Sequence, residues 1–441
     1  MTDAGRPASG GAAGSASAYT IARVEIWGQP VGVVAEDERG EVVFEYAEAF
    51  RTSGLELSPI HLPLSLRGPV SFPQLRRVDS FQGLPGLLAD SLPDAFGNAV
   101  IRRYFEARGT PESAMSPVQK LLYIGDRAMG ALQFRPQLDR VSPRASEALQ
   151  VAQLVAEARR VIEGDTSVAV PEMMQVGASA GGARAKALIL WNRDTNRVRS
   201  GFASPATGDE SWLIKFDGVT GGVGGHAMVK EFAPGPFGRM EYVYSIMARA
   251  AGVDMADTHL LHDRDFAHFM TRRFDRRDAT RLHMHTLGGM HHVDYAIRQA
   301  LSYEDYFRTI RLLGMGQAEV DQGFRRMAFN IAAHNQDDHV KNLAFLMGPD
   351  GRWMLAPAYD VSWADGGTWA RTHQMTAHGK DDHFTRDDLL AVGQEFDVPK
   401  SGADILQQVD ASLDLWKPEA ARAGLSDAWI TRVGKTFRRL T

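Results

Sequence analysis

The sequence has 441 residues, a formal net charge of −5 and no cysteine. This length allows two or three domains with substantial cores, and the small net charge gives no global electrostatic case for binding nucleic acid or an anionic membrane. The lack of cysteine excludes a disulfide scaffold, a thiolate metal site and a cysteine nucleophile, and it fits a cytosolic protein without proving it.

Residues 1–18 consist largely of glycine, alanine and serine with almost nothing to bury, and we interpret them as a disordered tail. They lack the basic and apolar regions of a signal peptide. No apolar run in the chain approaches the roughly 20 residues that a membrane span needs. We therefore expect a cytoplasmic protein without membrane contact.

The segment after this tail predicts a small antiparallel β-meander followed by a helix. Alternating apolar and polar residues, interrupted by glycine-containing turns, predict three strands. A helix is expected from about residue 95 to residue 107, with Asp94 as its N-cap. We interpret Asp90 and Asp94 as capping and turn residues rather than catalytic acids. The three predicted strands cover residues 20–27, 31–35 and 42–46.

The middle of the chain carries a glycine-rich segment between two predicted elements, an amphipathic helix over residues 145–162 and an apolar strand over residues 187–191. Glycine lets backbone N–H groups approach phosphate oxygens without a Cβ in the way. The G-K-[ST] ending of a Walker A motif is absent, so a flexible hairpin turn is the better interpretation of this segment alone. Kinase-like elements on either side favour phosphate binding instead. The segment reads Ser179-Ala180-Gly181-Gly182-Ala183-Arg184-Ala185-Lys186.

Lys215 is the single charge in an apolar strand predicted over residues 212–216. A lysine in a strand after a glycine-rich loop matches the kinase lysine that pairs with nucleotide phosphates, although a lysine at a strand edge can also simply solvate its head group. Its natural partner is Glu241, in a helix predicted over residues 240–251, and an ordinary exposed carboxylate is the competing interpretation. A strand over residues 266–276 follows.

A dense polar cluster, residues 334–342, separates an apolar helical run from a short strand. Such a cluster between buried elements favours a functional loop on a rigid base. Asp337 and Asn342 are five positions apart, the interval in the protein-kinase catalytic loop between the Asp that accepts the substrate proton and the Asn that binds a metal ion. Asp360 follows a further strand-like run, where kinases hold their other magnesium-binding Asp.

Three neighbours of Asp337 have open roles. Asp338 competes with Asp337 for the role of base, and the five-residue interval to Asn342 selects Asp337. His339 and Lys341 either orient the loop or contact phosphate, and a purely structural network is the alternative for each.

The rest of the chain is mostly amphipathic helix, as a kinase large lobe requires. A histidine group precedes these helices, and its H-x-H pair could bind zinc. No further ligands follow at metal spacing, so we expect a structural or polar-surface role. The histidines are His283, His285, His291 and His292. The helices are predicted over residues 303–313, 321–333, 386–395, 404–416 and 426–440.

Four motifs, taken together and in this order, resemble the HipA family of serine/threonine kinases, the toxin component of HipBA-type toxin–antitoxin systems. Each motif alone is weak, whereas four in family order are strong, and the resemblance covers nearly everything from Tyr19 to the C-terminus. The motifs are the glycine-rich segment at residues 179–186, Arg273-Phe274-Asp275-Arg276, the D-x-H-x-K-N pattern from Asp337 to Asn342, and Tyr359-Asp360.

The resemblance implies an α+β, bilobal protein-kinase-like fold of the HipA type, with an N-terminal β-meander subdomain and a helical C-terminal lobe. The expected parts are a disordered tail (1–18), a HipA-like N-terminal subdomain (19–145), the kinase N-lobe region with its glycine-rich loop (146–277) and the helical C-lobe with the catalytic and metal-binding loops (278–441).

The resemblance also implies ATP and Mg²⁺ as cofactors. Lys215 and Asp337 take the catalytic positions, and Asn342 and Asp360 take the positions of metal ligands. Contacts with the nucleotide are implied for Ser179, Ala180, Gly181, Gly182, Ala183, Lys186, Lys215, Arg272, Phe274, His339 and Lys341.

Two of these positions carry further implications. The adenine of ATP is expected to bond main-chain groups near Arg272 and Phe274. The family usually has Glu at the position of Arg272, so a side-chain contact from that Glu is lost here. A Ser at the position of Ser179 is autophosphorylated in HipA-like kinases, which expels the loop and inactivates the enzyme. A dianionic phosphoserine would repel ATP phosphates, and a solvated loop serine is the alternative.

The implied function is phosphorylation of Ser or Thr on a protein, with an aminoacyl-tRNA synthetase as the implied target and arrest of translation and growth as the result. A HipB-like helix-turn-helix antitoxin is the implied partner, and DNA is bound only through it, because no basic stripe marks this chain as a DNA binder. One alternative is a small-molecule phosphotransferase, against which the N-terminal meander argues. Another is an inactive kinase fold acting as a binding partner or co-repressor, which the retained Lys215, Asp337, Asn342 and Asp360 disfavour.

Overall fold

A computed structural model describes most of the chain, and four of the predictions fall outside the part that it describes. These concern the tail at residues 1–18, Asp94 as a helix cap, most of the helix over residues 145–162, and the glycine-rich residues 179–183. The described residues are 19–93, 95–106, 109, 115–138, 149–151, 154–156, 158, 184–219, 234–277, 280–366 and 370–441.

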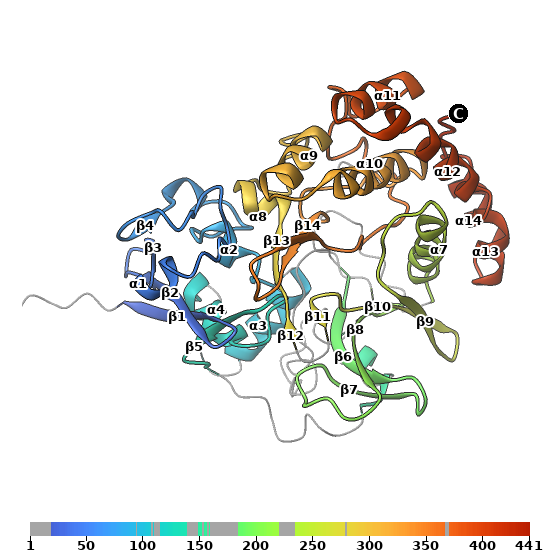
Figure 1. Cartoon of the computed structure of the whole chain (residues 1–441). Coiled ribbons are helices and arrows are strands. Elements are labelled where there is room, and N and C mark those ends of the chain that lie inside the picture. The colour runs from blue at the N-terminus through green and yellow to red at the C-terminus, as the bar shows by residue number, and fades with distance from the viewer. Residues whose placement is uncertain are drawn as a thin grey trace, which may run out of the picture.

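The N-terminal part is a five-stranded antiparallel sheet in the order β4-β3-β2-β1-β5, covered by short helices (Figure 1). Alternate residues of β1, such as Ala22 and Val24, are fully buried beneath these helices, while their neighbours face solvent. The predicted meander is thus confirmed, and β5 extends it beside β1. The elements are β1 (Thr20–Ile26), β2 (Gln29–Glu36), β3 (Val42–Tyr46), α1 (Glu48–Arg51), β4 (Val70–Ser71), η1 (Pro73–Leu75), α2 (Gly86–Ala89), α3 (Ala95–Glu106), α4 (Pro117–Ile124) and β5 (Leu132–Arg135).

A second antiparallel sheet has the order β7-β6-β8-β10-β9, with β8 at its centre and α7 packed on β9 and β10. Nearly all of β6 and the second half of β8 are buried, which explains the apolar runs there. This is the small lobe of the predicted kinase-like fold. The elements are β6 (Lys186–Asn192), β7 (Arg197–Ser200), β8 (Asp209–Lys215), α7 (Phe237–Ala250), β9 (Thr258–Asp263) and β10 (Phe266–Arg272).

The C-terminal part is mainly helical and holds the largest hydrophobic core of the described chain. Capping boxes start two of its helices, Ser302 with Asp305 at α9 and Thr385 with Asp388 at α11. The polar cluster of residues 334–342 lies between α10 and β14. The elements are β11 (Arg276–Arg277), β12 (Thr280–Arg281), β13 (His283–Thr286), α8 (Leu287–His291), α9 (Tyr303–Leu312), α10 (Gln317–Ala332), β14 (Ala344–Met347), β15 (Trp353–Leu355), α11 (Arg386–Glu395), η4 (Pro399–Gly402), α12 (Ala403–Leu413), α13 (Trp416–Arg422) and α14 (Asp427–Gly434).

Most predicted elements are present, and the differences have local causes. The helix predicted over residues 404–416 divides into α12 and α13, because Pro418 in the first turn of α13 has no N–H to donate. The helix predicted to reach residue 440 ends at Gly434, since the N–H groups of Arg438 and Leu440 bond other elements. Leu149, inside the helix predicted over residues 145–162, instead forms a β-bridge with Val198, whereas residues 151, 154–156 and 158 are helical as predicted.

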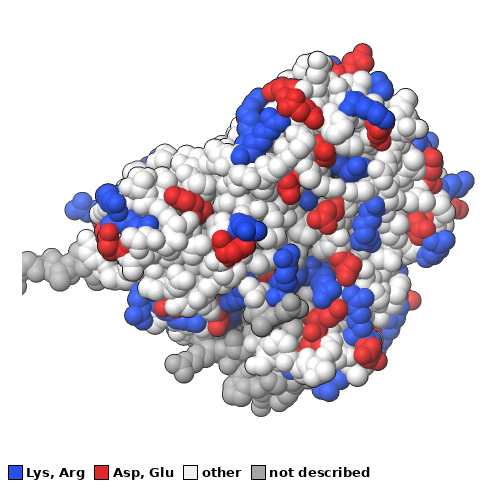
Figure 2. Space-filling model, viewed as in Figure 1, with Lys and Arg blue, Asp and Glu red and all other residues white. Residues whose placement is uncertain are grey.

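The surface charge is mixed on the face shown in Figure 2, where Lys and Arg residues are interspersed with Asp and Glu. Within the described chain, none of the helices combines the length and apolar character required to traverse a lipid bilayer.

Candidate active site

Three charged residues from separate elements meet beside the small-lobe sheet. Lys215 ends β8, Glu241 lies in α7, and Asp360 lies in the segment after β15. Lys215 Nζ is 2.6 Å from Glu241 Oε1 and also forms an ion pair with Asp360. The Lys–Glu contact expected from the sequence is therefore present, with Asp360 on the other side of the lysine.

The surroundings of this cluster keep Lys215 and Asp360 charged. Burial opposes the charge of Lys215, but Asp360 and Glu241 outweigh this effect and raise the lysine pKa. Burial also opposes the charge of Asp360, but Lys215 and Lys186 hold the pKa of the carboxyl group far below its ordinary value. A cation and an anion at fixed positions are what phosphate and metal binding require.

The end of the glycine-rich segment brings two further cations to this cluster, Arg184 and Lys186. Arg184 Nη1 donates to Glu241 Oε2 at 3.2 Å. Lys186 is buried in β6 and pairs in register with Lys215 in β8. The end of the glycine-rich segment is therefore anchored beside Lys215. Residues 179–183, for which nucleotide contacts are expected, lie outside the described residues.

The two adjacent aspartates of the polar cluster have opposite environments. Asp338 is 2% exposed, and its carboxylate contacts the Tyr303 hydroxyl at 2.7 Å, His373 Nδ1 at 2.8 Å and a backbone N–H. The Asp337 side chain is 41% exposed, with Oδ1 3.9 Å from His339 Nε2. Asp338 is thus occupied by the protein itself, whereas Asp337 can be reached by a substrate.

Asn342 and Asp360 line one pocket and are the candidate metal ligands. Asn342 Nδ2 donates to the Asp337 main-chain oxygen at 2.8 Å, and within the described chain its buried Oδ1 has no hydrogen-bond partner. Asp360 adopts φ 55°, a region that is uncommon for residues other than glycine and recurs at functional sites. Mg²⁺ uses oxygen ligands and needs only one or two carboxylates beside substrate phosphates. These two residues fit a magnesium ion.

His339 and Lys341 of the catalytic loop contact tyrosines outside the loop. The His339 ring centre lies 5.3 Å from that of Tyr295, and Lys341 Nζ lies 5.1 Å above the same Tyr295 ring. The Lys341 carbonyl oxygen accepts a hydrogen bond from the Tyr359 hydroxyl. These contacts orient the loop, and a contact with phosphate remains a prediction for both residues.

A mainly apolar pocket lies beside Lys215 and Asp360. An apolar lining with a few polar groups is typical of small-molecule sites, and the walls of this pocket come from both lobes and the connection between them. It is the described pocket best suited to a nucleotide base. The apolar lining residues are Met129, Leu213, Met255, Phe269, Phe274 and Met284.

The connection between the lobes borders this pocket at Arg272 and Phe274. The Arg272 N–H donates to the Asp257 carbonyl at 2.8 Å, and the Arg273 N–H donates to a carbonyl of β8 at 2.9 Å. A bound base would therefore use other main-chain groups of the connection. The exposed Arg272 side chain forms ion pairs with Glu210 and Asp257, so it is engaged outside the pocket.

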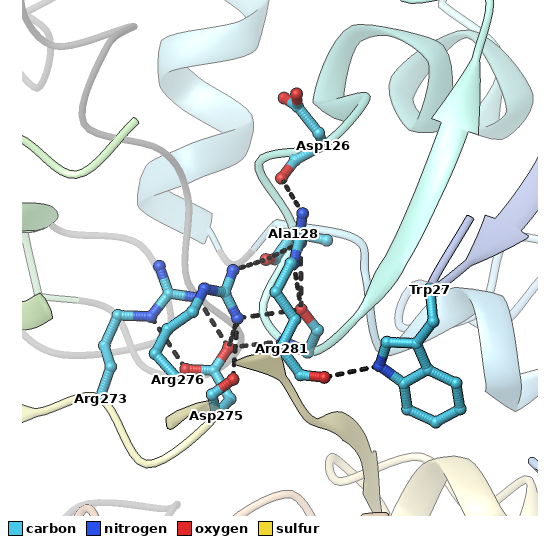
Figure 3. A network of polar contacts seen from close by, with 8 residues as sticks. Trp27, Asp126, Ala128, Arg273, Asp275, Arg276 and Arg281 are labelled. Atoms are coloured by element: carbon cyan, nitrogen blue, oxygen red, sulfur yellow. Dashed lines mark hydrogen bonds and ion pairs between the residues drawn. The ribbon is translucent and has the colours of Figure 1, made fainter. Parts of the chain in front are cut away.

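Asp275 of the R-F-D-R motif joins the lobe connection to the N-terminal subdomain (Figure 3). This fully buried carboxylate accepts hydrogen bonds from the Gly130 N–H at 2.7 Å, Arg273 Nε at 2.9 Å and Arg276 Nη1 at 2.6 Å. Burial opposes its charge, but the two guanidinium groups hold the pKa of Asp275 well below its usual range. Arg281 extends the network by donating to the Gly130 carbonyl at 3.0 Å. The motif therefore has a structural role, because it attaches the lobe connection to the N-terminal subdomain.

Asp90 has a role that the sequence did not reveal. It is the C-terminal cap residue of α2, but its buried carboxylate contacts His285 Nδ1 at 2.6 Å and accepts a hydrogen bond from the Thr286 N–H at 2.7 Å. His285 Nε2 also lies 3.0 Å from Ser58 Oγ. These contacts join the N-terminal subdomain to β13 across almost 200 residues of sequence, for which no local pattern exists.

The other histidines also make contacts within the protein. His283 is buried with Nε2 3.0 Å from a carbonyl of the N-terminal subdomain, His292 stacks on His61, and His291 lies 2.8 Å from a threonine hydroxyl. Burial lowers the pKa of His283 and of His292 to about 3. The described residues contain no group of three or more His, Cys, Asp or Glu side chains placed to hold a metal ion.

Two family models match this chain, one in its N-terminal part and one in the remainder. The family model for the HipA-like C-terminal domain matches residues 178–416, and the model for the HipA N-terminal domain matches residues 22–135. A Shewanella oneidensis MR-1 HipA structure, in a complex with HipB and operator DNA, is 16% identical with a TM-score of 0.63, covering 94% of this chain and 95% of that chain.

A second solved structure, the Helicobacter pylori proinflammatory kinase CtkA, is 11% identical and covers 58% of this chain and 87% of that chain. Its TM-score of 0.34 is too low to support an inference. The search of curated proteins found no match. Because the C-terminal family model alone covers more than half of the sequence, the chain belongs to the HipA family and has its bilobal kinase-like fold.

Proposed function

We propose that this chain is an ATP-dependent serine/threonine protein kinase that acts as a HipA-type toxin. The observation that carries the proposal is the position of Lys215 between Glu241 and Asp360, beside an apolar pocket. Asn342 lines the neighbouring pocket with a buried, unpartnered oxygen in the described chain, and its amide group bonds the main chain of Asp337. A nucleotide, a metal ion and an acceptor each have matching groups here.

Each of these residues has one task in the proposed reaction. The apolar pocket holds the base, and Lys215 binds phosphate oxygens while Glu241 fixes the position of the lysine. Asn342 and Asp360 would hold Mg²⁺, which neutralises phosphate charge when bound. Asp337 aligns the acceptor hydroxyl and accepts its proton. Positioning and charge compensation therefore supply most of the catalysis.

The acceptor in this proposal is a serine or threonine of a protein, and an aminoacyl-tRNA synthetase is the class of target that family membership favours. Its phosphorylation would block translation and arrest growth. A HipB-like antitoxin is the proposed partner and would connect the complex to DNA. The HipA of S. oneidensis, in a structure with HipB and operator DNA, supports this assignment through its similar fold.

Autophosphorylation of Ser179 is the proposed regulation. The segment that contains Ser179 leads into Arg184 and Lys186, both of which lie at the Lys215 cluster. A phosphate placed in this segment would compete with the phosphates of ATP for the same cations. The modified protein would then be inactive.

Phosphopeptide mass spectrometry of the purified protein after incubation with Mg-ATP tests this function, with Asp337→Asn treated in parallel. We expect phosphate on Ser179 in the wild type and none in the variant, followed by phosphorylation of a synthetase in a bacterial lysate. A wild type that binds ATP but phosphorylates neither itself nor any lysate protein would contradict a protein-kinase function. An inactive binding partner would then be the better explanation, and transfer to small molecules alone would indicate a small-molecule phosphotransferase.

A further inference from the structure

Residues 292–302 connect α8 to α9, and Tyr295 in this connection contacts the catalytic loop. The Tyr295 ring centre is 5.3 Å from that of His339, and Lys341 Nζ lies 5.1 Å above the Tyr295 ring. His339 Nε2 lies 3.9 Å from Asp337 Oδ1. A single side chain therefore separates Tyr295 from the proposed catalytic base.

Polar contacts fasten this connection to two other parts of the molecule. Asp294 Oδ1 accepts a hydrogen bond from Ser80 Oγ of the N-terminal subdomain at 2.9 Å. The Gln299 N–H donates to the Gln374 carbonyl at 2.7 Å, in the segment that follows Asp360. A surface held in this way is preformed, so a partner that binds it does not have to order it first.

The connection presents two large apolar side chains to solvent. Tyr295 is 36% exposed and Ile297 is 60% exposed. Among the described residues only eight large apolar side chains are exposed to this degree, and two of them occupy this one turn. Single exposed apolar residues need no explanation, whereas two in one turn, one of them in contact with His339 of the catalytic loop, form a candidate interaction site.

We propose that Tyr295 and Ile297 form a docking surface for the acceptor polypeptide and select an acceptor with an aliphatic or aromatic residue near its phosphorylated serine or threonine. The proposal rests on the kinase function above, because the acceptor hydroxyl must reach Asp337. An extended chain advances about 3.4 Å per residue. Because His339 contacts both Tyr295 and Asp337, the side chain that meets this surface belongs to a residue a few positions from the hydroxyl.

The test uses the full-length protein with Mg-ATP and a library of serine- and threonine-centred peptides in which every flanking position is varied. Ile297→Asp removes apolar contact at the proposed surface. Leu312→Asp is the matched control, because Leu312 is 59% exposed at the end of α9. Both positions are on the surface, so both variants are expected to fold.

We expect the wild type and Leu312→Asp to prefer an apolar residue at one flanking position. In Ile297→Asp this preference is lost, and KM for the best apolar peptide rises by about tenfold, as expected when one apolar contact is removed. Because Ile297 touches neither nucleotide nor Asp337 in this proposal, kcat and KM for ATP stay unchanged.

Self-phosphorylation is measured in the same reactions, and it distinguishes failure of the docking surface from failure of the kinase function. Peptide phosphorylation without an apolar preference, or equal behaviour of Ile297→Asp and Leu312→Asp, would overturn the docking surface. Self-phosphorylation without phosphorylation of any peptide would overturn it as well, and the kinase function would stand. If neither reaction occurs, the kinase function fails and the docking surface fails with it.

Discussion

The molecule has two buried charge clusters, one around Lys215 and one around Asp275 in the lobe connection. In the Asp275 cluster, Arg273, Arg276 and the Gly130 N–H all point to the same carboxylate. In the Lys215 cluster, the ion pairs border pockets, and the neighbouring Asn342 oxygen has no partner in the described chain. The protein's own donors satisfy the Asp275 carboxylate. Beside the Lys215 cluster, the Asn342 oxygen and the pocket leave room for a ligand.

We infer from this difference that the buried charges around Asp275 have a structural role and those around Lys215 a functional role. A buried ion costs several kcal/mol to desolvate, and the protein offsets this cost for Asp275 with its own donors. At the Lys215 cluster, the proposed nucleotide and metal ion would supply the partners that the protein leaves out. Substitutions in the Asp275 cluster should therefore alter stability, and those in the Lys215 cluster should alter activity.

The largest effect is expected for Asp275→Asn. Two guanidinium groups would remain buried without their anion, which costs about 3–5 kcal/mol of unfolding free energy. Urea unfolding measures this loss, and phosphate transfer per folded molecule should stay near that of the wild type. A loss below about 1 kcal/mol, the level of an exposed ion pair, would contradict a structural role.

The pH dependence of this loss follows from the lowered pKa of Asp275. A carboxyl group whose pKa is lower in the folded state contributes fully above its unfolded pKa of about 3.9 and loses that contribution as the pH falls through the folded pKa. The stability difference between wild type and Asp275→Asn should therefore be constant from about pH 5 to pH 9 and shrink below about pH 4.

Lys215→Met is expected to act on catalysis. Removing one preorganised cation from a phosphate site should lower kcat by about 10²–10³-fold. The loss of stability should be smaller than for Asp275→Asn, because Glu241 keeps Arg184 as a partner and the Asp360 side chain is 27% exposed. Steady-state phosphate transfer measures the effect, with the exposed Lys400→Met as a control. A Lys215→Met variant with the kcat of the wild type would show that Lys215 has no role in phosphate transfer.

The smallest effect is expected for Arg184→Gln. Arg184 is partly exposed and pairs with Glu241 at 3.2 Å, so this ion pair should contribute less than about 1 kcal/mol to nucleotide binding. Its loss should therefore raise KM for ATP by up to about fivefold. Arg308→Gln is the matched control, because Arg308 is an exposed arginine that pairs with Glu395 in the C-terminal part and lines neither pocket of the site. An unchanged KM in Arg184→Gln, or an equal rise in both variants, would show that Arg184 does not support the nucleotide site.

The sequence was most informative where a function depends on local spacing. The order of Lys215 and Glu241 and the position of Asn342 led to residues that line two adjoining pockets in the structure. The interval to Asn342 also led to Asp337, whose main-chain oxygen accepts a hydrogen bond from the Asn342 side chain. Strands and helices with clear apolar periodicity were also predictable, since the period reports which face is buried.

Contacts between distant segments could not be predicted in this way. Asp90 meets His285, and Asp275 meets Gly130, although each pair is separated by more than 140 residues. The choice of such partners depends on tertiary packing, for which a single sequence holds no periodic signal. For the same reason, the position of Tyr295 beside His339 was not foreseen.

The most direct measurement compares Asp337→Asn with Asp338→Asn in phosphate transfer and in urea unfolding. We predict that Asp337→Asn lowers transfer by about 10²–10⁴-fold, the contribution of a general base, without changing the unfolding midpoint. Asp338→Asn should lose about 1–3 kcal/mol of stability, because it disturbs buried hydrogen bonds, while its folded molecules transfer phosphate faster than Asp337→Asn. Wild-type transfer in Asp337→Asn would contradict the assignment of the exposed aspartate as the catalytic base.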